Sequence, residues 1–348
     1  MKIALCAVQV PFMKGGAEYL CDNLYNEMIK RDLDIEYIKI PYKWSPPQQL
    51  INSSLIWKLL DLSESNGVRI DGVIATKFPS YLINHPNKVV WLIHQHRQAY
   101  DLAYTEYDEF LNYDKNGEIV RKRIKKIDTK HLKEAKKVFT ISQNVSNRLF
   151  KYNGIRGEAL YPPPPFIGKY HCKDFSNYIL YPSRLDLLKR QFLVIESMQY
   201  VKSDVRLKIA GSGPQMENYK KLAKDLKVDS KIDFLGYVSE NNLLDLYANA
   251  GSVIYTPIDE DLGYVTLEAF LSKKPVITCK DSGEPVAFVE DGINGLIADP
   301  KPEHIAVKID RIFQDGLAKQ MGMRGYQKVK KLNLSWDHVI KNLLGSIR

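Results

Sequence analysis

The stretch YTPIDEDLGYVTLEAFLS, residues 255–272, indicates the fold of this chain more clearly than any other. Its first residues are typical of the end of a buried strand, and a helical pattern opens near Thr266 after a glycine-containing turn. Glu260 is therefore expected on the loop after the strand, and Glu268 in the first turns of the helix. Backbone N–H groups at the helix N-terminus lie between these carboxylates and favour a phosphate. This order suits a nucleotide sugar, in which hydroxyl groups flank a diphosphate, although two solvated surface charges would look the same.

Length and composition indicate a soluble two-domain protein. The chain has 348 residues, more than one hydrophobic core usually supports, with 45% hydrophobic and 26% charged residues. It lacks a run of about 18 apolar residues, so no transmembrane helix is expected. The apolar N-terminus meets Pro11 and the glycine pair Gly15 and Gly16 too early for a signal peptide, which disfavours a periplasmic solute-binding protein. Four scattered cysteines indicate reduced thiols, and the expected location is the cytoplasm.

Strand-like and helical patterns alternate along both halves of the chain. The strand-like runs are residues 2–10, 34–40, 72–75, 89–94 and 137–141 in the first half, and 178–181, 205–210, 232–235, 252–255 and 275–278 in the second. This alternation is typical of parallel sheets covered by helices on both faces. The proline run at 161–166 indicates a stiff linker, so we expect α/β domains at 1–160 and 161–332 that face each other across a cleft. Ligands bind such doubly wound sheets outside the carboxyl ends of the strands.

Two cations follow the strand-like run 178–181. The guanidinium of Arg184 can form paired hydrogen bonds with phosphate oxygens, and Lys189 supplies a compact positive charge. Together they would neutralise a diphosphate without a metal ion. An exposed Arg and Lys at a helix start would look the same, but their place at the carboxyl end of a strand favours a binding role.

Glycines mark two further strand ends in the second half. Gly211 and Gly213 permit a tight turn and a close approach of the backbone to a ligand. Gly236 and Tyr237 follow the next strand-like run, where a nucleotide base could rest. Ordinary strand-to-helix turns use glycine in the same way, so these positions are candidates for donor binding rather than a fingerprint.

Candidates in the first half also follow strand-like runs. Gly15 and Gly16 do not form a G-x-G-x-x-G fingerprint, and no acid follows the second strand in the expected place, so NAD binding is disfavoured. A phosphate or sugar could instead approach the backbone there. His94 and His96 end another strand-like run, with Arg97 beside them, and a histidine at a cleft edge can bond a substrate or serve the core. No third ligand lies nearby, so a metal site is not expected.

Together these segments resemble the retaining glycosyltransferases of family 4, which have the GT-B architecture of two Rossmann-like domains. The resemblance covers almost the whole chain and is carried by Gly15-Gly16-Ala17-Glu18, His94, Tyr181-Pro-Ser-Arg184 with Lys189, Gly211-Ser-Gly-Pro214, the segment 234–239, Glu260 with Glu268, and the segments 275–278 and 291–296. The combination of these motifs is far more specific for the family than any one motif alone.

The resemblance implies a role for each matching position. Arg184 and Lys189 would hold the donor diphosphate, Glu268 would bond the ribose, and Glu260 would contact the sugar ring. The backbone between the two glutamates, including Gly263, Tyr264, Val265 and Thr266, would support phosphate and sugar. The family's C-terminal helix returns to the first domain, and the apolar pattern within 333–348 fits that placement.

Two departures from the family's pattern bear on the site. The family usually has glycine shortly before the diphosphate-binding arginine, where this chain has Pro182 and Ser183. It commonly has Glu-Gly-Phe-Gly, where this chain has Glu260-Asp261-Leu262-Gly263. The first departure leaves the donor loop geometry open, and the second adds a negative charge near the sugar.

The implied reaction is hexosyl transfer from a UDP-, GDP- or dTDP-sugar to an acceptor hydroxyl with retention, without a cofactor or metal, in bacterial polysaccharide or glycoconjugate biosynthesis. Glu260, Arg184, Lys189 and His94 are the catalytic candidates. The leaving diphosphate would be stabilised electrostatically and could accept the acceptor's proton. The alternatives are an epimerase or phosphorylase on the same fold, or a catalytically silent glycan-binding subunit.

The first domain is expected to hold a glycan or a lipid-linked acceptor. His96, Arg97, Tyr100 and Tyr104 are candidates for that contact, and the tyrosines could stack on sugar rings. The net charge of +9 is concentrated in the basic run 121–137. This run could bind an acidic glycan or an anionic membrane at its inner face, or could be a solvated helix face. Nucleic acid is the least supported partner, because base-stacking residues are not interleaved with the charges.

Overall fold

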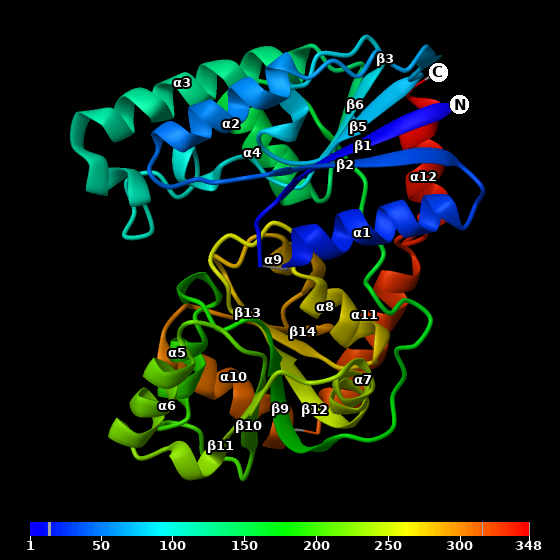
Figure 1. Cartoon of the computed structure of the whole chain (residues 1–348). Coiled ribbons are helices and arrows are strands. Elements are labelled where there is room, and N and C mark those ends of the chain that lie inside the picture. Colours follow the sequence, from blue (N-terminus) through cyan, green and yellow to red (C-terminus); the bar gives the residue numbers. More distant parts are fainter. Residues whose placement is uncertain (13–14, 315, 348) are drawn as a thin grey trace. The chain divides into compact units, whose positions relative to one another are not determined.

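The computed structural model describes residues 1–12, 15–314 and 316–347, and divides the chain into two compact units. Unit 1 comprises Met1–Pro165 with Ser335–Arg348, and unit 2 comprises Phe166–Leu334 (Figure 1). The expected boundaries, after residues 160 and 332, fall a few residues earlier. Each unit contains a six-stranded parallel sheet, so the predicted pair of doubly wound α/β domains is confirmed.

The sheet of unit 1 has the strand order β2-β1-β5-β6-β7-β8. Its strands are β1 (Lys2–Gln9), β2 (Asp34–Pro41), β5 (Gly72–Ala75), β6 (Lys88–Leu92), β7 (Lys137–Thr140) and β8 (Glu158–Ala159), and β3 (Glu64–Ser65) with β4 (Val68–Arg69) forms a separate hairpin. The central strands β5 and β6 are buried along their whole length, as expected for a parallel sheet that is covered on both faces. The strand order reverses at β1, which places the loops after β1 and β5 at the switch point where ligands bind.

Five α-helices and three short 3₁₀ turns accompany this sheet in the described residues. They are α1 (Gly16–Ile29), α2 (Gln48–Leu59), α3 (Asp114–Lys133), α4 (Gln143–Asn153) and α12 (Trp336–Gly345), with η1 (Ser80–Leu82), η2 (Arg97–Ala99) and η3 (Glu109–Tyr113). The last helix belongs to unit 1: Trp336 contacts Trp91 edge to face, and Val339 and Leu343 are fully buried.

The sheet of unit 2 has the strand order β11-β10-β9-β12-β13-β14. Its strands are β9 (Ser176–Pro182), β10 (Arg206–Ala210), β11 (Ile232–Gly236), β12 (Ala250–Ile254), β13 (Val276–Cys279) and β14 (Gly295–Ala298). From β9 the chain adds strands on one side through β11, and then returns to the other side of β9 with β12. The switch point therefore lies between β9 and β12, whose carboxyl ends carry the loops of Arg184, Lys189 and Glu260.

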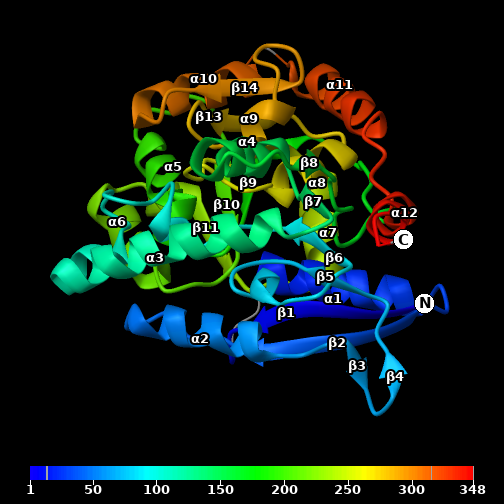
Figure 2. The ribbon, with the colours of Figure 1, turned by 90° about the horizontal axis from the view of Figure 1, so that it is seen from above.

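Seven helices and two 3₁₀ turns cover this second sheet in the described residues (Figure 2). They are α5 (Gln191–Ser197), α6 (Met216–Asp225), α7 (Glu240–Asn249), α8 (Tyr264–Leu271), α9 (Glu284–Phe288), α10 (Pro302–Gln314) and α11 (Ala318–Lys330), with η4 (Leu187–Lys189) and η5 (Asp229–Lys231). Helix α8 begins two residues before the expected Thr266, directly after Gly263 in a left-handed conformation. Across the described ranges, no helix is both long and apolar enough to cross a membrane.

Candidate active site

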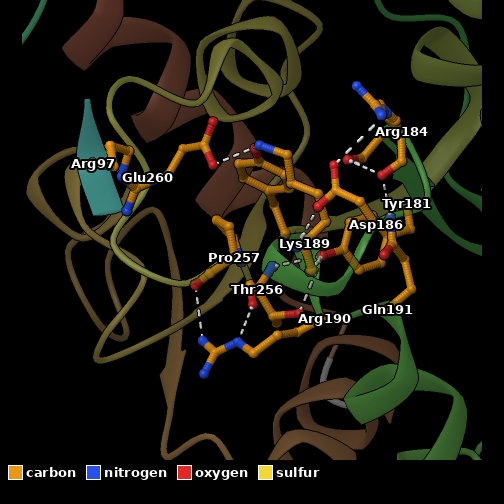
Figure 3. A network of polar contacts seen from close by, with 12 residues as sticks. Arg97, Tyr181, Arg184, Asp186, Lys189, Arg190, Gln191, Thr256, Pro257 and Glu260 are labelled. Carbon is orange, nitrogen blue, oxygen red and sulfur yellow. Dashed lines mark hydrogen bonds and ion pairs between the residues drawn. The ribbon is translucent and has the colours of Figure 1, made fainter. Parts of the chain in front are cut away.

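Lys189 and Glu260 meet at the switch point of unit 2. The Lys189 ammonium lies 2.6 Å from Glu260 Oε2 and donates a second hydrogen bond of 3.1 Å to the Tyr255 hydroxyl. Figure 3 shows the two charged side chains pointing toward each other from loops that follow β9 and β12. The side chains are 21% and 18% exposed, so the pair is partly shielded yet reachable from solvent. Two of the predicted site residues are thus brought into direct contact.

The Tyr255 phenol supports this pair from the protein interior. Burial raises the pKa of Tyr255 well above its usual range, with the Glu260 charge adding to the rise. The phenol therefore stays neutral, and its oxygen can accept the hydrogen bond from Lys189. Tyr255 was assigned only to the strand end by its sequence pattern, and its supporting role was missed.

A buried arginine anchors the Glu260 loop, and the sequence pattern did not reveal it. Arg190 donates hydrogen bonds of 2.8 Å to the carbonyls of Thr256 and Pro257 (Figure 3). It also forms a 2.6 Å ion pair with Asp281. The far end of the loop pairs with Gly283, which has φ +72°, and an added Cβ there would lie 2.5 Å from the Glu260 nitrogen. The loop is thus held at both ends before any ligand binds.

Arg184 lies on a second anchored loop, which follows β9. The amides of Ser183 and Leu185, on either side of it, donate to the carbonyls of Ala210 and Ser212. Its own side chain is 48% exposed and 3.9 Å from Asp186, so the guanidinium is largely open to solvent. Pro182 ends β9 inside the buried sheet, and the departure from the family's glycine is accommodated there.

Gly211 and Gly213 are required by this second loop. An added Cβ would lie 2.1 Å from the Ser183 carbonyl oxygen at Gly211, which has φ +147°, and 2.2 Å from the Leu185 carbonyl oxygen at Gly213. Both clashes involve backbone atoms, which cannot move away as a flexible side chain can. The structure therefore gives these glycines a packing reason, and their contact with a donor remains a prediction.

We expect Gly213→Ala to destabilise unit 2 by about 1–3 kcal/mol, because the added methyl overlaps the Leu185 backbone. Gly16→Ala is the matched control, since no atom lies within 4 Å of its added Cβ. Urea unfolding followed by far-UV circular dichroism measures the loss. All four tryptophans lie in unit 1, namely Trp44, Trp57, Trp91 and Trp336, so their fluorescence shows whether that unit is unaffected. Equal stability of the two variants would contradict the packing reason.

Glu268 is enclosed by two tyrosines that the sequence did not point to. The Tyr247 hydroxyl donates to Glu268 Oε2 at 2.6 Å, and the Tyr170 hydroxyl donates to Oε1 at 3.1 Å. The two rings meet edge to face. Burial raises the pKa of Glu268, and the two tyrosine hydrogen bonds oppose that rise. Both carboxylate oxygens therefore already have a donor.

The remaining donor-side candidates lie around this pair of loops. Gly263 has φ +73° and starts α8, so Tyr264, Val265 and Thr266 form the first turn, where the phosphate is predicted. The Thr266 hydroxyl is buried and has no hydrogen-bond partner among the described residues. Gly236, with φ +65°, is the last residue of β11, and Tyr237 follows it with 83% of its surface exposed.

In unit 1 the glycine pair lies beside a partly buried ion pair at the switch point. The Gly15 amide donates to Glu18 Oε2 at 2.9 Å, and the other carboxylate oxygen lies 2.7 Å from the Lys77 ammonium. Gly16 starts α1. Lys77 follows β5, and sequence analysis did not select it. His94 follows β6, and its Nδ1 lies 2.7 Å from the Gln95 carbonyl oxygen.

Two of the acceptor-side candidates, His96 and Tyr100, pack against the interior of unit 1. The His96 ring packs against Phe78 and Phe110, and burial lowers its pKa to about 3. Tyr100 is buried and donates to Asp128 at 2.8 Å, so its ring is not available to stack on a sugar, contrary to our expectation. The pattern of polar and aromatic residues in this segment did not show whether its side chains are exposed to a ligand or buried in the core.

Arg97 and Tyr104 retain accessible groups. Arg97 is partly exposed and forms a 2.7 Å ion pair with Asp101. The Tyr104 ring is 67% exposed, and its hydroxyl donates to Glu118 at 2.9 Å. Of the four acceptor-side candidates, these two remain compatible with contact to a ligand.

The predicted basic run does not form one surface. Arg121 is buried and lies 2.7 Å from the fully buried Asp108, so it does not contribute to a surface charge. Lys137 pairs with Glu158. Between them lie exposed cations on α3, and the exposed Lys136 after it. In the described part of the chain, no group of His, Cys, Asp and Glu side chains could hold a metal ion.

The fold is the GT-B architecture of two parallel-sheet α/β domains that solved glycosyltransferase structures share. The whole chain aligns with HepE from Anabaena in complex with UDP and glucose, with a TM-score of 0.72, 15% identity and coverage of 100% and 99% of the two chains. It also aligns with sucrose-phosphate synthase from Thermosynechococcus elongatus, with a TM-score of 0.77, 17% identity and coverage of 99% and 98%. At such identities the likeness shows the fold alone.

A family match by sequence lies within unit 2. Residues 167–328 match the family described as glycosyl transferases group 1. An uncharacterized glycosyltransferase of Methanocaldococcus jannaschii is 30% identical over 172 residues, which are 49% of this chain and 44% of that protein. The human alpha-1,3/1,6-mannosyltransferase ALG2 is 28% identical over 116 residues, covering 33% and 28%. The lipopolysaccharide core biosynthesis glycosyltransferase LpsE of Rhizobium meliloti is 31% identical over 125 residues, covering 35% and 36%. The chain thus spans less than half the length of these relatives.

Proposed function

We propose that the protein is a glycosyltransferase that moves a hexosyl unit from a nucleotide diphosphate sugar to an acceptor hydroxyl, with retention and without a metal. The observation that carries the proposal is the Lys189–Glu260 pair, held at the switch point of unit 2 on two anchored loops. A cation and a carboxylate in contact suit a donor in which a diphosphate is joined to a sugar. The group 1 similarity of residues 167–328 supports the same assignment.

Each charged group has a distinct part in the proposed transfer. Lys189 and Arg184 stabilise the negative charge that develops on the leaving diphosphate, and the N-terminal turn of α8 adds its backbone N–H groups. Glu260 accepts hydrogen bonds from sugar hydroxyls and orients the ring. The bond from the anomeric carbon to the phosphate oxygen breaks while the bond to the acceptor oxygen forms. The acceptor's proton passes to the leaving phosphate on the same face, and His94 is the remaining catalytic candidate.

Unit 1 is the proposed acceptor side, and unit 2 the proposed donor side. Glu268 would form a hydrogen bond with the ribose. The other donor contacts would come from the first turn of α8 and from the loops that contain the predicted donor-binding glycines, namely Gly15, Gly16, Gly211, Gly213 and Gly236. The acceptor would be a glycan or a lipid-linked sugar in polysaccharide or glycoconjugate biosynthesis. The similarity to LpsE, a lipopolysaccharide core biosynthesis glycosyltransferase, supports this class of acceptor.

A thermal-shift screen with UDP, GDP and dTDP tests the donor side, because a ligand selective for the folded state raises its melting temperature. We expect one nucleoside diphosphate to raise it by several degrees, with or without EDTA. The matching nucleotide sugars then serve as donors in a transfer assay. Single replacements Arg184→Ala, Glu260→Ala and Glu268→Ala are expected to lower the rate about a hundredfold each.

Arg206→Ala is the control for these three variants, because it removes an exposed arginine whose partner is Asp233 in the same unit. Unchanged transfer rates in all three site variants would reject the proposed site. Binding of a nucleoside diphosphate without transfer or hydrolysis of any donor would point to a glycan-binding subunit instead.

A further inference from the structure

Helix α3 carries a stripe of cations on its exposed face. Its members share spacings of three, four or seven residues, which place them on one side of the helix: Lys115, Lys122, Lys126, Lys130 and Lys133, with Arg123 at the edge. All six are exposed, and the stripe extends over about 27 Å at 1.5 Å per residue. The helix runs along one side of unit 1 (Figures 1 and 2).

The opposite face of α3 fixes the orientation of this stripe. Ile124, Asp128 and Leu132 are buried at the helical spacing, and the buried Arg121 lies on the same side. Because Arg121 is paired with Asp108 and Tyr100 is bonded to Asp128, the inner face is attached by polar as well as apolar contacts. The cations therefore cannot turn inward without breaking these contacts.

Few acidic side chains of the described residues balance the charges of the stripe. Glu118 lies at the flank, where it bonds Arg121 and is 3.9 Å from Lys122. Among the described acidic side chains, none forms an ion pair with Lys126, Lys130 or Lys133. Like charges four residues apart destabilise a helix, and here they recur from Lys122 to Lys126 and Lys130. An external anionic partner would relieve this repulsion.

Exposed aliphatic side chains accompany the cations. Ile119 lies within the stripe and is 62% exposed, and Leu111 on the adjoining η3 is 57% exposed. Helix α2 packs beside α3 and exposes Leu55, Ile56 and Leu59, the last of them 82% exposed. A soluble polyanion makes no use of exposed aliphatic groups, whereas a bilayer surface offers anionic headgroups beside apolar chains.

We propose that the α3 stripe, with Ile119, binds the surface of an anionic lipid bilayer and holds the protein at the membrane. The cations attract anionic headgroups from within a Debye length, and Ile119 enters the boundary between headgroups and acyl chains. This placement is independent of the donor chemistry of unit 2. It favours acceptors that are themselves carried by lipid.

Sedimentation of the full-length protein with lipid vesicles tests the proposal. One set of vesicles contains phosphatidylcholine alone, and the other also contains phosphatidylglycerol. We expect binding to the anionic vesicles only, and weaker binding at higher salt. Replacing Lys122, Lys126, Lys130 and Lys133 together by Gln is expected to lower the vesicle affinity by more than about tenfold. Ile119→Ser is expected to lower it several-fold without changing the salt dependence.

The matched control replaces the same number of lysines on another helix. Lys220, Lys221, Lys224 and Lys227, on and just after α6, are replaced by Gln in the same way, although two of them already have acidic partners. Equal loss of binding in this control would show that net charge alone is responsible and would overturn the proposal. Binding to inorganic polyphosphate as strong as to vesicles, unaffected by Ile119→Ser, would show a soluble polyanion partner instead. Absence of binding to anionic vesicles would also refute it.

Discussion

Lys189→Met is expected to reduce kcat/KM for glycosyl transfer by about a thousandfold, mostly through kcat. The change removes the cation proposed to stabilise the leaving diphosphate. It also removes the 2.6 Å partner of Glu260, whose carboxylate then lacks the contact that orients it. Methionine keeps the length and apolar stem of lysine, so the packing around Tyr255 is preserved. Steady-state kinetics with the donor found in the thermal-shift screen measures the effect.

Lys221→Met is the matched control for this prediction. Lys221 forms a 2.5 Å ion pair with Asp225, and both side chains are well exposed, so its loss should leave transfer unchanged. Glu260→Gln, alone and combined with Lys189→Met, shows whether the contributions of the two side chains to the rate depend on each other. If they do, the double variant is scarcely slower than the worse single variant. A rise in KM with unchanged kcat would limit Lys189 to donor binding and contradict its role in the transition state.

Arg121→Met is expected to destabilise unit 1 by about 3–5 kcal/mol, because it leaves a buried carboxylate without its counter-charge. The guanidinium lies 2.7 Å from Asp108, donates to the Gln98 carbonyl at 2.5 Å, and packs against the rings of Tyr104 and Phe110. Asp108 has no exposed side-chain surface, so water cannot replace the lost partner. Urea unfolding followed by tryptophan fluorescence reports on this unit.

Two further variants separate burial from simple loss of charge. Arg206→Met removes an exposed arginine of unit 2 and should cost at most about 1 kcal/mol. Adding Asp108→Asn to Arg121→Met should recover part of the loss, because the amide is uncharged and its oxygen still accepts from the backbone N–H of Phe110, while the Tyr104 N–H loses the acceptor that the second carboxylate oxygen supplied. A loss below about 1 kcal/mol for Arg121→Met would show that the pair is not needed for the stability of unit 1.

The fold could be predicted from the sequence because the patterns that mark strands, helices and turns are local. Continuous apolar runs such as β6 and β12 mark strands that are buried on both faces, and the glycines and prolines between them mark turns. The same reasoning placed Arg184, Lys189 and Glu260 at strand ends. It could not place them together, because the meeting of β9 and β12 depends on the strand order, which local patterns do not contain.

The rest of the candidate site depends on contacts between distant segments. Tyr170 and Tyr247 meet at Glu268 from positions far apart in the sequence, and no spacing links them. Arg190 is adjacent to a predicted residue, yet its side chain turns inward to the Thr256 carbonyl, and its backbone adopts φ +54°. Arg121 was counted with its basic neighbours. Its helical spacing to the buried Ile124 and Asp128 would have indicated an inward side chain.

The two tyrosines at Glu268 have a consequence for how a nucleotide would be received. Each oxygen of the Glu268 carboxylate has two lone pairs, but the side chain is buried, so a ribose hydroxyl that reaches it is expected to displace the Tyr170 hydroxyl, which forms the longer of the two hydrogen bonds. Ribose affinity would then be a difference between two sets of bonds, and the displaced Tyr170 hydroxyl would need a new acceptor. Nucleotide binding at this position would therefore replace one hydrogen bond of Glu268 by another. The nucleotide-bound and free forms of unit 2 would differ first in the segment that carries Tyr170.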